Sequence, residues 1–350
     1  MNIATRNNLH RLKQELVDFV SPRYFDRRAK RVSIHQAAPR FLMEKLIDRT
    51  VRTMVGSPVS DFARRLAPFR FPDFPSFTST ARLPDIEALV VVTKKDFATL
   101  KACIRGIQRG SMNPVGRITV ITPSADIELC NEALKHCNSS LPTSVKVVQE
   151  ESFLTESLAK DLRLAFGDRF GWVLQQLLKL AFVESSTFGG VLVVDGDTVL
   201  LTPRIWLGAD GAQLLPVSSE YNHPYYTFLQ ELGLGDAQPE TTHVTHHMLM
   251  QPKLLKSFLA NRGFQSVEEL GRYLAKKTFK DSHAPFSVDY ELYAQSLLTL
   301  VPEKARLSKF GNFGCPTAPE STCIEIQQLA DSISSSGRYF SVSFHTHLRG

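Results

Sequence analysis

The sequence predicts an α/β protein in which helices flank a central sheet. From residue 86 onward, short apolar runs alternate with amphipathic segments, as strands and helices do around a largely parallel sheet. One of these runs, Val191 to Val194, is β-branched and apolar and ends in two carboxylates. The 350 residues, 43% hydrophobic and 22% charged, are typical of a soluble globular chain and allow one large domain with an extension.

Charge sets the first 85 residues apart from the rest. They hold 16 Lys and Arg against 8 Asp and Glu, whereas the remainder holds 25 against 27. We expect a helical basic N-terminal arm over 1–67 and a linker over 68–85, where Pro68, Pro72 and Pro75 exclude a helix. The arm either attaches to anionic lipid or an acidic partner, or is a solvated arm packed on the body; we favour the second interpretation.

Composition also limits the location of the protein. No apolar run approaches the roughly 20 residues of a membrane span. The start of the chain lacks a signal peptide's apolar region, and the five scattered cysteines suit reduced thiols. We expect a cytoplasmic protein without a nucleic-acid partner, or one held peripherally at the inner membrane face by its arm.

The body, residues 86–350, is predicted as one domain. Strands are expected over 86–93, 117–122, 145–148, 190–194, 213–217 and 340–344. Helices are expected over 96–109, 125–137, 153–166, 171–186, 223–232, 252–261, 266–276 and 287–299. Asp96 and Ser287 are well placed as N-caps of two of these helices.

The stretch Asp195-Gly196-Asp197 ends the fourth predicted strand. On a strand, two carboxylates at i and i+2 point to the same face, and open α/β sheets bind ligands at the carboxyl ends of their strands. Neighbouring carboxylates repel each other, so the pair favours a hard divalent cation, Mn²⁺ or Mg²⁺. The alternative is an Asp-Gly turn in which Asp197 caps a neighbouring segment.

Other polar residues stand where they could line the same crevice. Thr93, Lys94 and Asp96 follow the first strand and would contact a nucleotide if that strand lies beside the motif. Without that placement, solvated lysines beside a helix cap are the better interpretation. Gln176 and Lys179 are i, i+3 neighbours on an apolar helix, where a lysine could neutralise phosphate and a glutamine could bond sugar hydroxyls.

Imidazoles and aromatic rings gather late in the chain. His223 and Tyr225 combine rings with hydrogen-bonding groups, a combination suited to gripping a sugar. His246 and His247 belong to a His-Val-Thr-His-His run whose spacing fits no zinc signature.

Two further patterns allow both a functional and a plain interpretation. His345 and His347, at i and i+2, either complete a metal shell or form an unstructured tail. Asp289 and Glu291 open a helix, where they either complement the helix dipole or present a general base.

Taken together, these segments resemble a known family. The buried strand ending in Asp195-Gly196-Asp197 resembles the DxD motif of GT-A fold glycosyltransferases. The segments Gly171 to Lys179, His246 to Leu249 and Asp289 to Tyr293 look like an uncharacterised bacterial family of predicted GT-A glycosyltransferases. The resemblance covers about residues 86–347 and implies a GT-A-like, Rossmann-type mixed sheet flanked by helices.

The resemblance implies transfer of a sugar from a nucleotide-sugar, with a mild preference for UDP, to a glycan or other hydroxyl acceptor. Asp195 and Asp197 would bind Mn²⁺ or Mg²⁺, joined by His345 and His347, and the cation would stabilise the leaving diphosphate. The same resemblance favours donor contacts for Thr93, Lys94, Asp96, Gln176, Lys179 and Asp195, acceptor contacts for His223, Tyr225, His246 and His247, and Asp289 or Glu291 as base.

A rival interpretation uses the same motif differently. Val193 to Val199 also resembles the first motif of haloacid-dehalogenase-type phosphatases, with Asp195 as nucleophile and Asp197 as acid/base. That motif normally lies near the start of its domain, whereas here about 190 residues precede it, and we find no later Asp-Asp pair to complete the magnesium site. A non-catalytic sugar-binding protein would need the dicarboxylate to be a mere turn.

Overall fold

The computed structural model describes residues 82–135, 143–218, 225–226, 229–230, 242–277, 287–309, 311–316, 323–335 and 339–345. The predicted arm and nearly all of the predicted linker lie outside these ranges, as does most of the predicted helix over 223–232. Within them, no helix is both long and apolar enough to cross a membrane.

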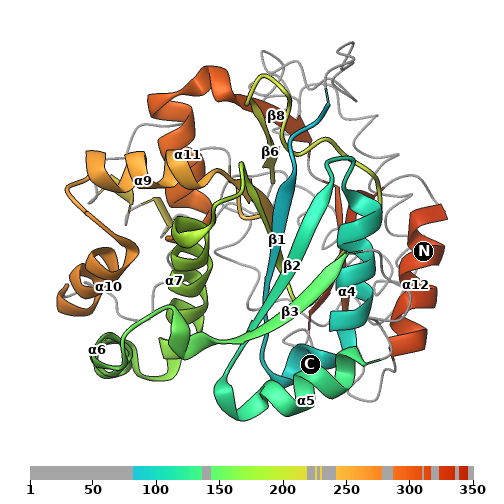
Figure 1. The fold of residues 1–350 in the computed structure, drawn as a ribbon, viewed down its shortest axis with the longest axis horizontal. Helices are drawn as coiled ribbons and strands as arrows, with labels where there is room; N and C mark the ends of the chain where they lie inside the picture. Colours follow the sequence, from blue (N-terminus) through green and yellow to red (C-terminus); the bar gives the residue numbers. More distant parts are fainter. Residues whose placement is uncertain are drawn as a thin grey trace, which may run out of the picture.

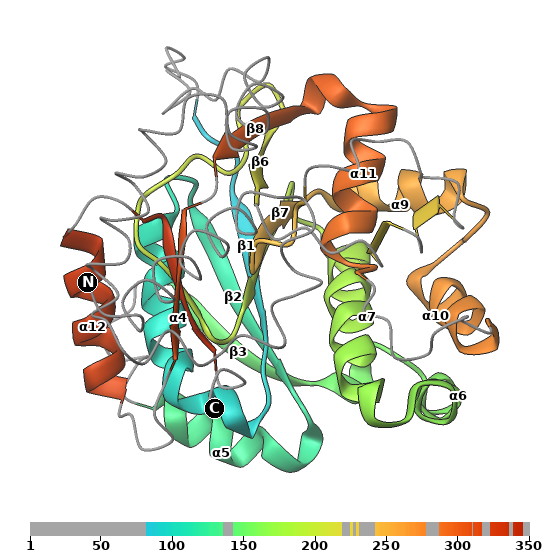
Figure 2. The ribbon, with the colours of Figure 1, turned by 180° about the vertical axis from the view of Figure 1, so that it is seen from behind.

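A five-stranded sheet forms the centre of the fold (Figures 1 and 2). In spatial order its strands are β3 (Ser144–Gln149), β2 (Val115–Thr122), β1 (Ile86–Val91), β4 (Val191–Asp195) and β7 (His247–Met250). The first four are parallel, and β7 runs antiparallel to β4. The predicted α/β class, a mixed sheet flanked by helices, is confirmed.

Helices cover both faces of this sheet because its buried strands are apolar on both sides. Along β1, Ala88 and Val90 join the core under α4 (Phe97–Gly110) and α5 (Ile127–Leu134). Leu89 and Val91 point to the opposite face, as successive strand residues must. The core on that face includes α6 (Glu156–Phe166), α7 (Phe170–Ser185), α9 (Pro252–Asn261), α10 (Val267–Lys276) and α11 (Tyr290–Leu300) (Figure 1).

Two smaller sheets complete the described fold. Strand β10 (Ser341–His345) lies between β5 (Thr198–Leu200) and β9 (Asn312–Pro316), and β6 (Gln213–Val217) pairs with β8 (Ala305–Lys309). Helix α12 (Cys323–Ser335) packs on the first of these sheets beside α4. The Phe344 amide donates to the Asp197 carbonyl at 2.8 Å, so the late strand runs directly beside the Asp195-Gly196-Asp197 turn.

The predicted elements agree with the structure at most positions and differ at a few. The prediction for α9 has the right bounds, but α11 begins at Tyr290 with Asp289 as N-cap, three residues later than predicted. Ser287 is not the cap, although its hydroxyl accepts from the Glu291 amide at 3.4 Å. Strands β5, β7, β8 and β9 and helix α12 were not predicted, because these segments are short or carry no regular apolar period.

Candidate active site

The acidic motif lies at the point where the strand order of the sheet reverses. The chain builds β1, β2 and β3 outward in one direction and then places β4 on the other side of β1. Asp195 is the last residue of β4 and pairs in register with Val91, the last residue of β1. Open α/β sheets bind ligands in the crevice outside such a reversal. The predicted position of the motif, at the carboxyl end of an interior strand, is therefore observed.

Close packing between the ends of β1 and β4 fixes the motif. A Cβ atom on Gly196 would lie 2.5 Å from Cγ1 of Val92 and 3.3 Å from Cβ of Asp96. The Thr99 hydroxyl donates to the Gly196 carbonyl at 2.7 Å. Only glycine therefore fits between the two aspartates without displacing the end of β1.

Asp96 is held inside the turn that follows β1, where Lys94–Asp96 forms a single 3-10 turn. Its Oδ2 accepts from the Thr93 amide at 3.0 Å. Burial raises its pKa to about 6, and the nearby Asp197 raises it further against the opposing effects of Thr93 and Lys95. Thr93 and Lys94 are exposed at the same edge. The four residues thus share one end of the sheet.

Asp195 is bonded by side chains from three separate segments. Its Oδ1 accepts from Lys179 Nζ of α7 at 2.7 Å and from the Tyr290 hydroxyl of α11 at 2.9 Å. Its Oδ2 lies 3.3 Å from Nδ1 of His246, which needs the proton on Nδ1 if the carboxylate is ionised. Burial alone would raise the pKa of Asp195, but Lys179 and His246 hold it well below its usual value.

His246 reaches Asp195 through a strained backbone. Its φ of 62° is in the left-handed region, which costs a non-glycine residue roughly 1–2 kcal/mol. This conformation accompanies a second contact, in which the His246 carbonyl accepts from the Asp195 amide at 2.8 Å. Strain of this kind gathers at functional sites.

Lys179 bridges two carboxylates in the interior. Its ammonium lies 2.7 Å from Asp195 and 2.9 Å from Asp289, and only 4% of its side chain is exposed. Burial alone would lower its pKa, but Asp195 and Asp289 raise it above the usual value. The ammonium also sits 4.5 Å from the centroid of the Tyr290 ring. The formal charge of Lys179, Asp195, Asp197 and Asp289 together is therefore −2.

The two predicted base candidates occupy different surroundings. Asp289 is buried and accepts from Lys179 and, at 3.1 Å, from the Ser287 hydroxyl. Glu291, fully buried, accepts from the Thr242 hydroxyl, the His243 amide and the Gln295 amide group at 2.7, 2.5 and 3.0 Å. Only Asp289 shares a partner with the acidic motif, and a base role for either residue stays a prediction.

Other predicted site residues lie in the core or at the edge of the described region. Gln176 is buried, and its Oε1 accepts from the Val288 amide at 2.7 Å, so it fastens α7 to the segment before α11. His247 is buried with its ring 5.4 Å from Trp206, which leaves 1% of the residue exposed to an acceptor. Tyr225 is half-buried on the larger core. Donor and acceptor contacts for these residues stay predictions.

The predicted late histidines are only partly placed. His223 and His347 lie outside the described residues. The backbone of His345 ends β10, directly after Phe344, whose amide bonds the Asp197 carbonyl. The chain therefore brings His345 next to the acidic motif, although about 150 residues separate them in sequence.

The donor set suits a cation that a substrate helps to hold. Among the described residues, no group of three or more His, Cys, Asp and Glu side chains surrounds one point. Mg²⁺ is commonly held by one or two carboxylates together with waters and substrate phosphates. Asp197, partly exposed beside the buried Asp195, fits that pattern. Which side chains touch the metal is not tested by the geometry alone.

Two contributors were missed by sequence reasoning. Tyr290, which bonds Asp195, stands between the two acids that were predicted, and only an aromatic ring at a helix start could have signalled it. Thr99, which fixes Gly196, lies one turn into α4 and carries no signal in the sequence.

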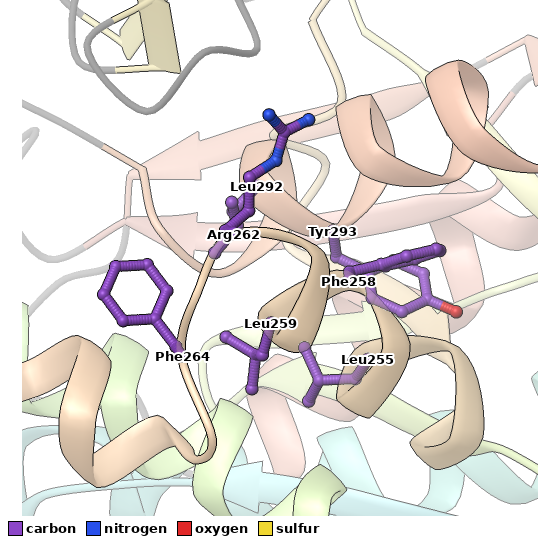
Figure 3. Close-up of a pocket in the computed structure, with 7 residues that line it drawn as sticks. All are labelled: Leu255, Phe258, Leu259, Arg262, Phe264, Leu292 and Tyr293. Atoms are coloured by element: carbon purple, nitrogen blue, oxygen red, sulfur yellow. The ribbon is translucent and has the colours of Figure 1, made fainter.

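A small cavity elsewhere is not a ligand site. It lies between α9 and α11 and is lined by Leu255, Phe258, Leu259, Arg262, Phe264, Leu292 and Tyr293 (Figure 3). Its volume of about 10 Å³ is room for roughly one water molecule. A nucleotide or sugar must therefore bind at the strand edge rather than here.

The fold and the site together define an α/β protein with an acidic ligand edge at its topological reversal. No family model matches the chain, and no curated protein matches it. Among solved structures, mouse xyloside xylosyltransferase 1 in its apo form aligns at 13% identity and a TM-score of 0.40, covering 76% of this chain and 99% of that one.

Two further solved structures align at similar levels. The apo bifunctional glycosyltransferase WbbM has 12% identity and a TM-score of 0.41, covering 77% of this chain and 46% of that one. The mannosyltransferase Ktr4p of S. cerevisiae has 9% identity and a TM-score of 0.38, covering 61% and 68%. At these identities and scores the likeness gives this chain neither a family nor an activity.

Proposed function

We propose that this chain is a metal-dependent glycosyltransferase that moves a sugar from a nucleotide-sugar donor to a glycan or other hydroxyl acceptor. The observation that carries the proposal is the Asp195-Gly196-Asp197 turn at the carboxyl end of β4, beside the end of β1 at the reversal of strand order. This is the position where α/β sheets bind nucleotides.

The charge of the site supports a cation. Its single buried ammonium, on Lys179, is already shared by Asp195 and Asp289, and Asp197 adds a further negative charge. A diphosphate brought to this edge alone would be repelled, since two like charges 4 Å apart cost about 4 kcal/mol near a protein surface. Mn²⁺ or Mg²⁺ held at the Asp195–Asp197 pair would offset that repulsion and stabilise the charge of the leaving diphosphate.

The remaining residues of the edge suit the two substrates. Thr93 and Lys94 are exposed at the end of β1 and would contact the nucleoside end of the donor, for which UDP is our preference. His246 and Tyr225 lie on the side of the motif toward α11 and the larger core, and we assign this side to the acceptor. His345 approaches the cation from β10.

An inverting transfer would need a base for the acceptor hydroxyl. Asp289 and Glu291 are both buried and bonded within the protein, so either would have to be uncovered when the substrates bind. Transfer with retention, assisted by the donor's own phosphate, would need neither residue as a base.

The test is a donor-hydrolysis screen of nucleotide sugars with Mn²⁺, followed by calorimetry of the preferred nucleoside diphosphate with and without the metal. We expect metal-dependent binding that Asp197→Ala abolishes. The matched control is Asp331→Ala, which removes an exposed aspartate on α12 paired with Arg109. Nucleotide binding unchanged by Asp197→Ala would contradict the proposal.

The phosphatase alternative is less supported. Its nucleophile would be Asp195, but both oxygens of that carboxylate are bonded to Lys179, Tyr290 and His246. Hydrolysis of simple phosphate esters without any sugar transfer in the same screen would favour the phosphatase over the glycosyltransferase.

A further inference from the structure

The two aspartates of the motif differ in what surrounds them. A carboxylate offers about four lone-pair positions. Three positions of Asp195 face Lys179, Tyr290 and His246, and 19% of its side chain is exposed. Asp197, two residues later, accepts from the adjacent Thr198 hydroxyl at 3.2 Å and lies in the turn that follows β4.

The partners of Asp195 tie together elements that are distant in sequence. Lys179 comes from α7, Tyr290 from α11, and His246 from the segment that leads into β7. Lys179 also binds Asp289, so the start of α11 is connected to β4 through one ammonium. This arrangement is a joint at the carboxyl edge of the sheet.

The same ammonium disfavours a metal on Asp195. It lies 2.7 Å from Oδ1, and a divalent cation on that carboxylate would face a positive charge in a largely buried setting, where like charges repel strongly. Removing Lys179 from its two carboxylates would be costly as well, because a buried charge would lose its partner.

From this geometry, and resting on the function proposed above, we propose that Lys179 is a positioning residue. It holds Asp195 in an internal ion-pair network with Asp289, so that Asp197 is the aspartate of the pair that touches the cation. Asp289 then serves as the second counter-ion of Lys179. Asp195 orients the turn that carries Asp197 without coordinating the metal.

The experiment measures Mn²⁺ binding to the full chain in the presence of UDP, together with the number of metal-bound waters from the paramagnetic relaxation of water protons. Asp197→Asn should weaken Mn²⁺ binding by more than about 100-fold, beyond the 10–100-fold range of residues that act behind a ligand. Asp195→Asn should weaken binding by only about tenfold and leave the water number unchanged.

Lys179→Met should act in the opposite direction. Without the ammonium, Asp195 can reach the cation, so Mn²⁺ should bind more tightly and lose one bound water. Lys179→Arg, which keeps the charge, should restore the water number of the unsubstituted protein. If Lys179→Met does not fold, the comparison of Asp195→Asn with Asp197→Asn still decides the matter.

The matched control is Glu87→Gln at the opposite end of β1. Glu87 is fully buried and accepts from Arg117, Thr119 and Ser186, so its loss perturbs a comparable buried network far from the motif. It should not change Mn²⁺ affinity. Equal losses of metal for Asp195→Asn and Asp197→Asn would overturn the inference, as would a Lys179→Met protein with unchanged affinity and water number. Absence of any Mn²⁺–UDP binding in the unsubstituted protein would instead overturn the proposed function.

Discussion

At the scale of single residues, burial decides what a polar side chain does. Gln176 and Glu291 stand in patterns that favour ligand contacts, yet each is bonded to a backbone amide inside the protein. Glu291 accepts from the Thr242 and His243 segment and thereby joins the segment leading to His246 to α11. These two side chains organise the site from behind, because an unpaired polar group there would be costly.

The buried imidazole of His247 makes stability depend on pH. Burial, with Arg204 nearby, lowers its pKa to about 3 from 6.5. Between these values the unfolded state binds the proton and the folded state does not. Its contribution is therefore complete above pH 6.5 and is lost as the pH falls toward 3, by about 1.4 kcal/mol per pH unit.

The corresponding measurement is the free energy of unfolding by urea at several pH values between 3.5 and 7. We expect His247→Gln to show a shallower fall of stability with acid than the unsubstituted protein. An identical slope in both proteins would show that this imidazole is not the titrating group.

At the scale of elements, the contact between the end of β1 and the acidic turn is the tightest feature of the site. We expect Gly196→Ala to lower the free energy of unfolding by about 1–3 kcal/mol, because its Cβ would overlap Val92. It should also weaken metal and nucleotide binding, since the turn must move.

The control is Gly171→Ala on α7, where an added Cβ meets nothing within 4 Å. In a helix this change should be neutral or stabilise the protein by up to about 1 kcal/mol. Denaturant unfolding and nucleotide calorimetry of both variants provide the comparison. Equal effects of the two substitutions would contradict a close packing role for Gly196.

At the scale of the whole molecule, every described contact of the site comes from residues 91–345. We expect a truncated chain beginning at Leu83 to keep metal-dependent nucleotide binding, because β1 starts only at Ile86. The measurement is calorimetry of the truncated and full chains, with circular dichroism to verify folding. A folded truncated chain without nucleotide binding would assign the basic arm a part in the site.

The sequence by itself determined the class of fold and the position of the acidic motif. Both follow from local signals: the alternation of apolar runs and amphipathic helices, and an apolar strand that ends in Asp195-Gly196-Asp197. Such signals depend only on neighbouring residues, so the strands β1 to β4 and helices such as α9 could be predicted with nearly correct bounds.

Tertiary structure alone decided the division of roles within the site. Lys179, Tyr290 and His246 are separated by 67 to 111 residues, and they meet at Asp195 because β4 lies between β1 and β7 while α7 and α11 pack against the same face. No local pattern records which polar side chains will be buried together. The pairing of charges in a low-dielectric interior, which separates Asp195 from Asp197, therefore becomes visible only when the chain is folded.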